Sequence, residues 1–139
     1  MVRVVDNTDS RRFDSVTATP TIIDVETTVY SKGHPFDPNN KLVSYACYPN
    51  IFKYFTDPDF SGYARQQLNE SGCLVGFNIK FDLHWLCNIG CAIPDRARIW
   101  DCQLAEFVYS GQKDSLISLD ECLERYDLPR KISAVRNIS

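Results

Sequence analysis

The sequence has no long apolar run, few glycines and no excess of positive charge. No stretch approaches the roughly 20 apolar residues that cross a bilayer, and residues 1–14 have no signal-peptide pattern. We therefore expect a cytoplasmic protein without a membrane partner. With 6 Gly, 7 Pro and 44% hydrophobic residues, the chain is not collagen-like, low-complexity or disordered. Its 139 residues suit a single domain with one core.

The charge balance excludes a passive nucleic-acid binder with a strongly basic surface. Lys and Arg number 15 and Asp and Glu number 18, which gives a net charge of −3. A polyanionic partner would have to be bound through local cations or through metal ions.

Disulfides and a zinc site are also poorly supported by the sequence. The six cysteines are scattered, with no CxxC pair, so we expect buried reduced thiols rather than a secreted disulfide framework. His84, Cys87 and Cys91 have helical spacing, but without a CxxC or HxxxH pair we favour core thiols over zinc ligands.

The pattern of apolar residues predicts an α/β domain over residues 19–139, after a polar lead-in at 1–18. The segment 21–26 is typical of a central strand, apolar on both faces until its acidic end. Further strands are expected at 41–48, 51–55, 73–77 and 99–100, and helices at 61–71, 79–89, 103–108 and 118–126. This order predicts a mixed five-stranded sheet flanked by helices.

Local signals mark where several of these helices begin and end. Gly72 and Gly90 are expected to close the first two helices. Asp101 stands where the next helix needs an N-cap, and Ser118 with Glu121 forms a capping box for the last helix.

Three carboxylates are expected to converge at one edge of the sheet. Asp24 and Glu26 are two residues apart on a strand, so their side chains leave the same face. Asp82 lies one turn into the helix that follows the 73–77 strand. If that strand lies beside the first, this turn approaches Asp24.

The alternative is that these acids have no special function: all three are solvated, and the charge of Asp82 is stabilised by the dipole of its helix. Two acids on an otherwise apolar strand argue against it. Gathered carboxylates repel one another unless cations neutralise them, and hard divalent ions such as Mg²⁺ or Mn²⁺ prefer oxygen ligands. Two such ions are the usual device for displacement at phosphorus.

Two motifs in this order carry a family resemblance. Residues 23–28 (IDVETT) resemble the first motif of the DEDD (DnaQ-like) 3′ to 5′ exonucleases, and residues 75–83 (VGFNIKFDL) resemble the second. Residues 99–107 and 118–123 resemble connecting helices of the proofreading domain of phage and bacterial family A DNA polymerases. The resemblance covers residues 19–131 and implies a ribonuclease H-like fold.

The resemblance also implies roles for individual residues. Asp24, Glu26 and Asp82 match three of the family's four metal-binding carboxylates, which hold two Mg²⁺ or Mn²⁺ ions. Thr27 matches a position that contacts the terminal nucleotide, and Asn78 matches one that shapes the site. Further candidate substrate contacts are Phe81, as a second site-shaping or stacking residue, Tyr30 as a stacking residue, and Lys32 and Lys80 as phosphate contacts.

The family's third motif, a Tyr or His followed by an Asp, has no match here: residues 132–139 contain no acid. Three interpretations stay open: an exonuclease whose fourth carboxylate comes from a second chain, a non-catalytic module that binds metal or nucleic acid, and a minimal nuclease. In the last, the fourth ligand would be one of Asp101, Asp114 and Asp120, although a helix cap is the favoured role of Asp101.

The expected substrate is a single-stranded or frayed DNA 3′ end, because that end must separate from its complement to reach the acids. RNA is an alternative. The expected partner is a downstream polymerase or C-terminal fragment, and the likeness to phage polymerases suggests a phage protein in the host cytoplasm.

Overall fold

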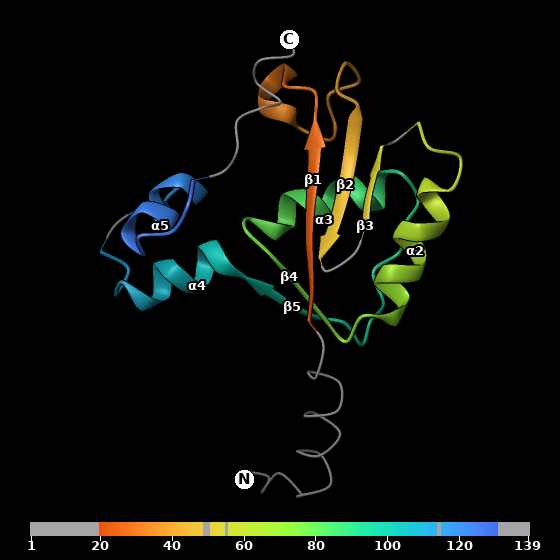
Figure 1. Cartoon of the computed structure of the whole chain (residues 1–139). Helices are drawn as coiled ribbons and strands as arrows, with labels where there is room; N and C mark the ends of the chain where they lie inside the picture. Colours follow the sequence, from red (N-terminus) through yellow and green to blue (C-terminus); the bar gives the residue numbers. More distant parts are fainter. Residues whose placement is uncertain (1–19, 49–50, 55, 114, 131–139) are drawn as a thin grey trace, which may run out of the picture.

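The computed structural model describes residues 20–48, 51–54, 56–113 and 115–130, drawn in colour in Figure 1. The lead-in expected at 1–18 lies outside these residues. The described chain is an α/β arrangement of a mixed sheet with helices packed against it, which confirms the predicted class. No helix in the described ranges is both long enough and apolar enough to span a membrane.

The sheet has the strand order β3-β2-β1-β4-β5, with β1 in the centre as predicted. β1 pairs antiparallel with β2 and parallel with β4, and β4 pairs parallel with β5. The strands are β1 (Thr21–Thr27), β2 (Leu42–Tyr48), β3 (Ile51–Tyr54), β4 (Cys73–Gly76) and β5 (Arg98–Asp101). Their bounds lie within one or two residues of those expected.

The four α-helices begin and end close to the expected residues, whereas a short 3₁₀ helix after β1 was not predicted. They are the 3₁₀ helix η1 (Tyr30–Gly33) and the α-helices α2 (Phe60–Glu70), α3 (Ile79–Asn88), α4 (Cys102–Tyr109) and α5 (Leu119–Arg125). The predicted caps are confirmed. The Asp101 carboxylate accepts a hydrogen bond from the Gln103 N–H at the start of α4, and both bonds of the Ser118–Glu121 capping box are present at the start of α5.

The two predicted glycine stops have different outcomes. Gly90 adopts a left-handed conformation with φ of +88° directly after the end of α3, as expected. Gly72 also follows the end of α2, as predicted, but the C-cap is Ser71, which is extended and donates its N–H to the Gln67 carbonyl, and Gly72 has no positive φ. A polar C-cap in the extended conformation turns the chain here, so no left-handed glycine is needed.

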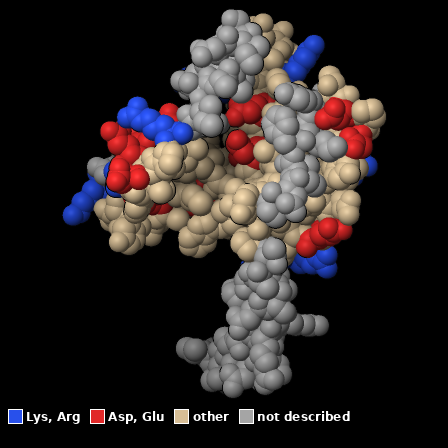
Figure 2. All heavy atoms as spheres, in the orientation of Figure 1, with Lys and Arg blue, Asp and Glu red and all other residues tan. Residues whose placement is uncertain are grey.

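The two faces of the sheet differ in what covers them. α3 passes behind the sheet in Figure 1, and both α2 and α3 contribute to the core on that side. β1 is central and apolar on both faces as predicted, but the two faces are not equally covered, since Ile22 on the other face is 45% exposed. Figure 2 shows acidic side chains over the upper part of β1 on this second face, in a hollow of the surface.

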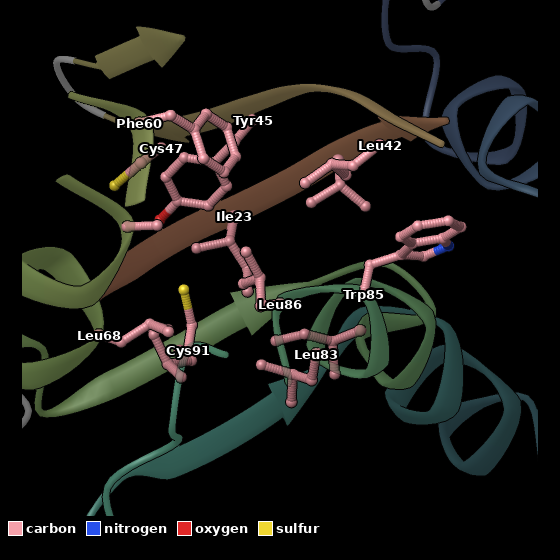
Figure 3. Close-up of a cluster of buried hydrophobic side chains, with 14 residues drawn as sticks. Ile23, Leu42, Tyr45, Cys47, Phe60, Leu68, Leu83, Trp85, Leu86 and Cys91 are labelled. Atoms are coloured by element: carbon pink, nitrogen blue, oxygen red, sulfur yellow. The ribbon is translucent and has the colours of Figure 1, made fainter. Parts of the chain in front are cut away.

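The core lies between the sheet and the two helices (Figure 3). Ile23 of β1 and Tyr45 of β2 are buried against Leu86 of α3. The Tyr45 ring also meets the Phe60 ring of α2 edge to face, with centroids 6.2 Å apart. Side-chain alternation along β1 sends Ile23 and Val25 into this core, and therefore sends the residues between them to the opposite face.

Candidate active site

The carboxyl-terminal half of β1 presents two acids on its less covered face. Asp24 is exposed and Glu26 is partly buried, while Ile23 and Val25 beside them are buried. On β2 the directly paired residues are Ala46 and Ser44, both with small side chains. The structure thus confirms that Asp24 and Glu26 share one face at the end of the central strand.

Asp82 is held against the same short segment of β1. The parallel pairing of β1 with β4 ends at Ile22 and Val75, and the chain then turns into α3. Beyond this point the N–H of Val25 donates to Asp82 Oδ1 at 2.9 Å. Because Val25 lies between the two acids in the sequence, this bond holds the Asp82 carboxyl at the strand segment that carries them. Asp82 itself is only 3% exposed.

The turn between β4 and α3 is closely packed. A Cβ at Gly76 would lie 2.9 Å from a side-chain carbon of Ile79, so only glycine fits there without a shift. Asn78, the N-cap of α3, has a φ of +54°, and its N–H donates to Asp101 Oδ1 at 3.0 Å. The same oxygen accepts the Gln103 N–H at 2.9 Å. Asp101 therefore ties this turn to α4, which confirms its predicted structural role.

Thr27 and Phe81, both expected to contact substrate, meet at Gly33. A Cβ at Gly33 would lie 2.7 Å from Thr27 Oγ1 and 3.3 Å from the Phe81 ring. The φ of Gly33 is +76°, and its carbonyl accepts the Trp85 Nε1–H at 2.9 Å. The end of β1, the loop after it and α3 therefore form one packed unit around these two residues.

Tyr30 is presented by a loop that Asn40 holds closed. The buried Asn40 amide donates to the carbonyls of Tyr30 and His34, and its oxygen accepts from the Thr28 hydroxyl at 3.1 Å. The Tyr30 side chain points outward and is 62% exposed. The sequence analysis missed Asn40; the available signal was an Asn at the end of a turn-rich segment, where amides often bond to the backbone.

The residues considered for metal binding meet only part of the requirement. Asp24, Glu26 and Asp82 offer the oxygen donors that Mg²⁺ and Mn²⁺ prefer, on one strand and the turn bonded to it. Within the part of the chain that the structure describes, however, no group of three or more His, Cys, Asp or Glu side chains is gathered closely enough to hold a metal ion. The three acids therefore match such an ion in donor chemistry, but their side chains are not gathered into one group.

The His84, Cys87 and Cys91 trio does not share one environment. His84 and Cys87 are exposed, whereas Cys91 follows the end of α3 and lies in the core. Burial raises the pKa of the Cys91 thiol. Of the acids considered as a fourth ligand, Asp120 is exposed on the first turn of α5, and Asp114 lies outside the described residues.

Neither a protein-family model nor a curated protein matches this chain. Its function is therefore inferred from the geometry around Asp24, Glu26 and Asp82 and from the two motifs that contain them.

Proposed function

We propose that the chain carries the active site of a metal-dependent 3′ to 5′ exonuclease, on a ribonuclease H-like fold of the DEDD (DnaQ-like) type. The observation that carries this proposal is the hydrogen bond from the Val25 N–H to Asp82 Oδ1. It brings the acid of the second motif to the strand segment between the two acids of the first. The strand order places both motifs on neighbouring parallel strands, as such a site requires.

In this proposal Asp24 and Glu26 would hold two Mg²⁺ or Mn²⁺ ions, with Asp82 as a further ligand, directly or through water. Such ions would supply an activated water and neutralise charge on the leaving oxygen. The chain's own contribution is to fix the acids. Asp24 and Glu26 are set by the strand, and the buried Asp82 is held by a backbone bond.

The proposed substrate is a single-stranded or frayed DNA 3′ end, with RNA as the alternative. Thr27 adjoins Glu26 and contacts the terminal nucleotide, while Phe81 packs near it across Gly33. Asn78 shapes the turn below the site. Tyr30, with a largely exposed ring, stacks on a base.

One observation favours a second candidate, a catalytically incomplete nucleic-acid-binding or polymerase-associated module that needs another chain for the fourth carboxylate. Among the described residues no metal-holding group of three is assembled, and Asp101 is occupied as a cap. Trp100, Leu104 and Val108 are each more than half exposed, which leaves apolar surface on β5 and α4 for a partner.

Hydrolysis of a 5′-labelled single-stranded oligonucleotide with Mn²⁺ or Mg²⁺ tests the proposal. We expect a ladder of products that shortens from the 3′ end. Asp24→Asn should slow turnover at least a hundredfold, because it removes a charged ligand from the proposed metal site. Asp95→Asn is the matched control, because Asp95 is an exposed acid in the turn before β5, at the opposite end of that strand from Asp101.

The two candidates give different results in this assay. If the oligonucleotide stays intact but binds the wild-type chain, the incomplete module is the better account. Turnover that is equal in wild type and Asp24→Asn would contradict an active site at β1.

A further inference from the structure

The loop between β1 and β2 exposes aromatic rings although its backbone is tightly fixed. Phe36 is 74% exposed, and its ring lies between two histidines, with centroids 5.3 Å from His34 and 6.2 Å from His84 of α3. Both histidines are themselves exposed. An aromatic group of this kind, uncovered on its outer side, offers flat faces to a ligand.

Several bonds fix the loop from within. Asn40 bonds to two of its carbonyls, and Trp85 bonds to the Gly33 carbonyl. The Ser31 hydroxyl donates to Asp37 at 2.6 Å, and this bond is the main cause that holds the pKa of Asp37 below its usual value. Ser31 and Lys32 both have positive φ. Strained backbone held by such a network is typical of binding loops, since it presents side chains without further ordering.

Exposed lysines lie on the loop and the helix that carry these rings, in a chain that is acidic overall. Lys80 is exposed one helical turn before His84, so both lie on the same face of α3. Lys32 and Lys41 are exposed within and at the end of the loop. Among the described residues of the loop, Asp37 is the one acid, and its carboxylate is bonded to Ser31 and to the Asn39 N–H.

We propose that His34, Phe36, His84, Lys32 and Lys80, the loop–α3 surface, bind an unpaired segment of nucleic acid upstream of its 3′ end. Phe36 stacks on a base and the lysines contact phosphates, as in single-strand binding grooves. The surface is continuous with the candidate active site, because Gly33 of the same loop packs against Thr27 and Phe81. The inference rests on the proposed function for the identity of the ligand, and it adds a contact away from the acids.

Binding of a fluorescein-labelled oligothymidine without divalent ions tests this surface, because no hydrolysis can interfere. Fluorescence anisotropy should show about tenfold weaker binding by Phe36→Ala, from the loss of one base–aromatic stack. Tyr109→Ala is the matched control, since Tyr109 is an 83% exposed aromatic on α4, and it should bind like wild type. Lys80→Ala should lower the slope of log affinity against log salt by somewhat less than one.

Phe36→Leu keeps apolar bulk but removes the ring, so it separates stacking from an effect on folding. It should bind as weakly as Phe36→Ala while melting at the wild-type temperature. Wild-type affinity in both variants, or equal affinity for a blunt duplex and for the single strand, would overturn the inference. If Asp24→Asn shows no effect on hydrolysis while Phe36→Ala still loses binding, the surface stands and the exonuclease proposal fails.

Discussion

Asp82 combines a structural and a proposed catalytic role in one carboxyl group. Its Oδ1 accepts the Val25 N–H where β4 no longer pairs with β1. Asp82→Asn keeps an acceptor oxygen for this N–H but removes the charge. Asp82→Ala also leaves a buried donor without its acceptor, which costs about 1–3 kcal/mol.

We therefore predict that Asp82→Asn retains most of the stability of the wild type and that Asp82→Ala loses about 1–3 kcal/mol in urea denaturation. Both variants should lose 3′ hydrolysis of the labelled oligonucleotide, because both lack the third carboxylate. Wild-type turnover in Asp82→Asn would show that the charge at this position has no part in the reaction.

Gly33 gives a second prediction at the scale of one residue. Alanine there would bring its Cβ within 2.7 Å of Thr27 Oγ1 and would have to adopt a φ of +76°. We expect Gly33→Ala to lower the free energy of unfolding by about 1–3 kcal/mol. The control is Gly62→Ala in α2, where nothing lies within 4 Å of the new Cβ.

Gly62→Ala should instead stabilise the chain by about 0.5–1 kcal/mol, from the better helix propensity of alanine. Urea denaturation of both variants measures the two opposite changes. Equal effects of the two substitutions would mean that the loop does not pack on Thr27 as described.

The residue types of the site could be predicted from sequence, but their contacts could not. The i, i+2 spacing of Asp24 and Glu26 is enough to put them on one face. The bond from Val25 to Asp82 depends on where the pairing of β1 with β4 stops, and this register is a tertiary property. The Asn40 network was missed for a different reason: it lies within one loop, and the residue type alone does not say which backbone groups the amide bonds to.

At the scale of elements, Asp101 links two parts of the fold through one oxygen. Asp101→Ala removes the N-cap of α4 and the acceptor of the Asn78 N–H, so we predict a loss of about 1–2 kcal/mol of stability. Asp120→Ala, which removes only an exposed acid from the first turn of α5, should cost about 0.3–1 kcal/mol. Chemical denaturation compares the two variants.

A second substitution separates the cap from a ligand role. Asp101→Asn keeps the accepting oxygen, so it should retain both stability and any 3′ hydrolysis. Loss of hydrolysis at unchanged stability would instead make Asp101 the fourth metal ligand.

α4 and α5 are joined by a buried carboxylate whose ionisation is shifted by its partners. Glu106 accepts hydrogen bonds from the Tyr126 hydroxyl at 2.6 Å and from Arg125 Nη1 at 2.8 Å. The Tyr126 bond is the largest cause that lowers the pKa of Glu106 below its ordinary 4.5, and it raises the pKa of Tyr126 to about 12.

A carboxyl whose pKa is lower in the folded state stabilises the fold above its unfolded pKa and loses this effect as the pH falls through the folded value. A hydroxyl whose pKa is higher in the folded state stabilises the fold below its unfolded pKa of 10. This stabilisation is lost as the pH rises toward the folded value of about 12. We therefore predict that Glu106→Gln melts below wild type near pH 7, and that the gap narrows below pH 4.5 and above pH 10.

Glu124→Gln is the control for this pH series. Its carboxylate meets Arg130 at 3.4 Å on the exposed surface, where an ion pair contributes little. A gap between Glu106→Gln and wild type that is the same at every pH would contradict the shifted pKa values.

The positions of the helices and strands could be predicted closely from the sequence, because both the spacing of apolar residues and the helix-capping residues are visible in it. The spacing of Ile79, Leu83, Leu86 and Ile89 predicts one buried stripe on α3; the first three are buried, and Ile89, the C-cap, is partly buried against the core. Gly72 shows the limit of such signals. Gly72 follows the helix end as expected, but it is the extended Ser71 and not a left-handed glycine that caps α2.

At the scale of the whole molecule, the asymmetry of the sheet decides where chemistry can occur. Both core helices cover one face, so the other face keeps the β1 acids accessible beside partly exposed apolar side chains such as Ile22. The sequence could not reveal which face stays uncovered, because the alternation of side chains along a strand does not say on which side the helices pack. The net charge of −3 likewise hides the local excess of lysines on the loop–α3 surface.

The central claim is that Asp24, Glu26 and Asp82 act together as one divalent-metal site. Binding of Mn²⁺, followed by the loss of the free-ion signal in electron paramagnetic resonance, tests it without requiring catalysis. We predict saturable binding by the wild type and at least tenfold weaker binding by Asp24→Asn and by Asp82→Asn, with Asp95→Asn unchanged. Equal Mn²⁺ binding by all four proteins, or none by the wild type, would contradict the account.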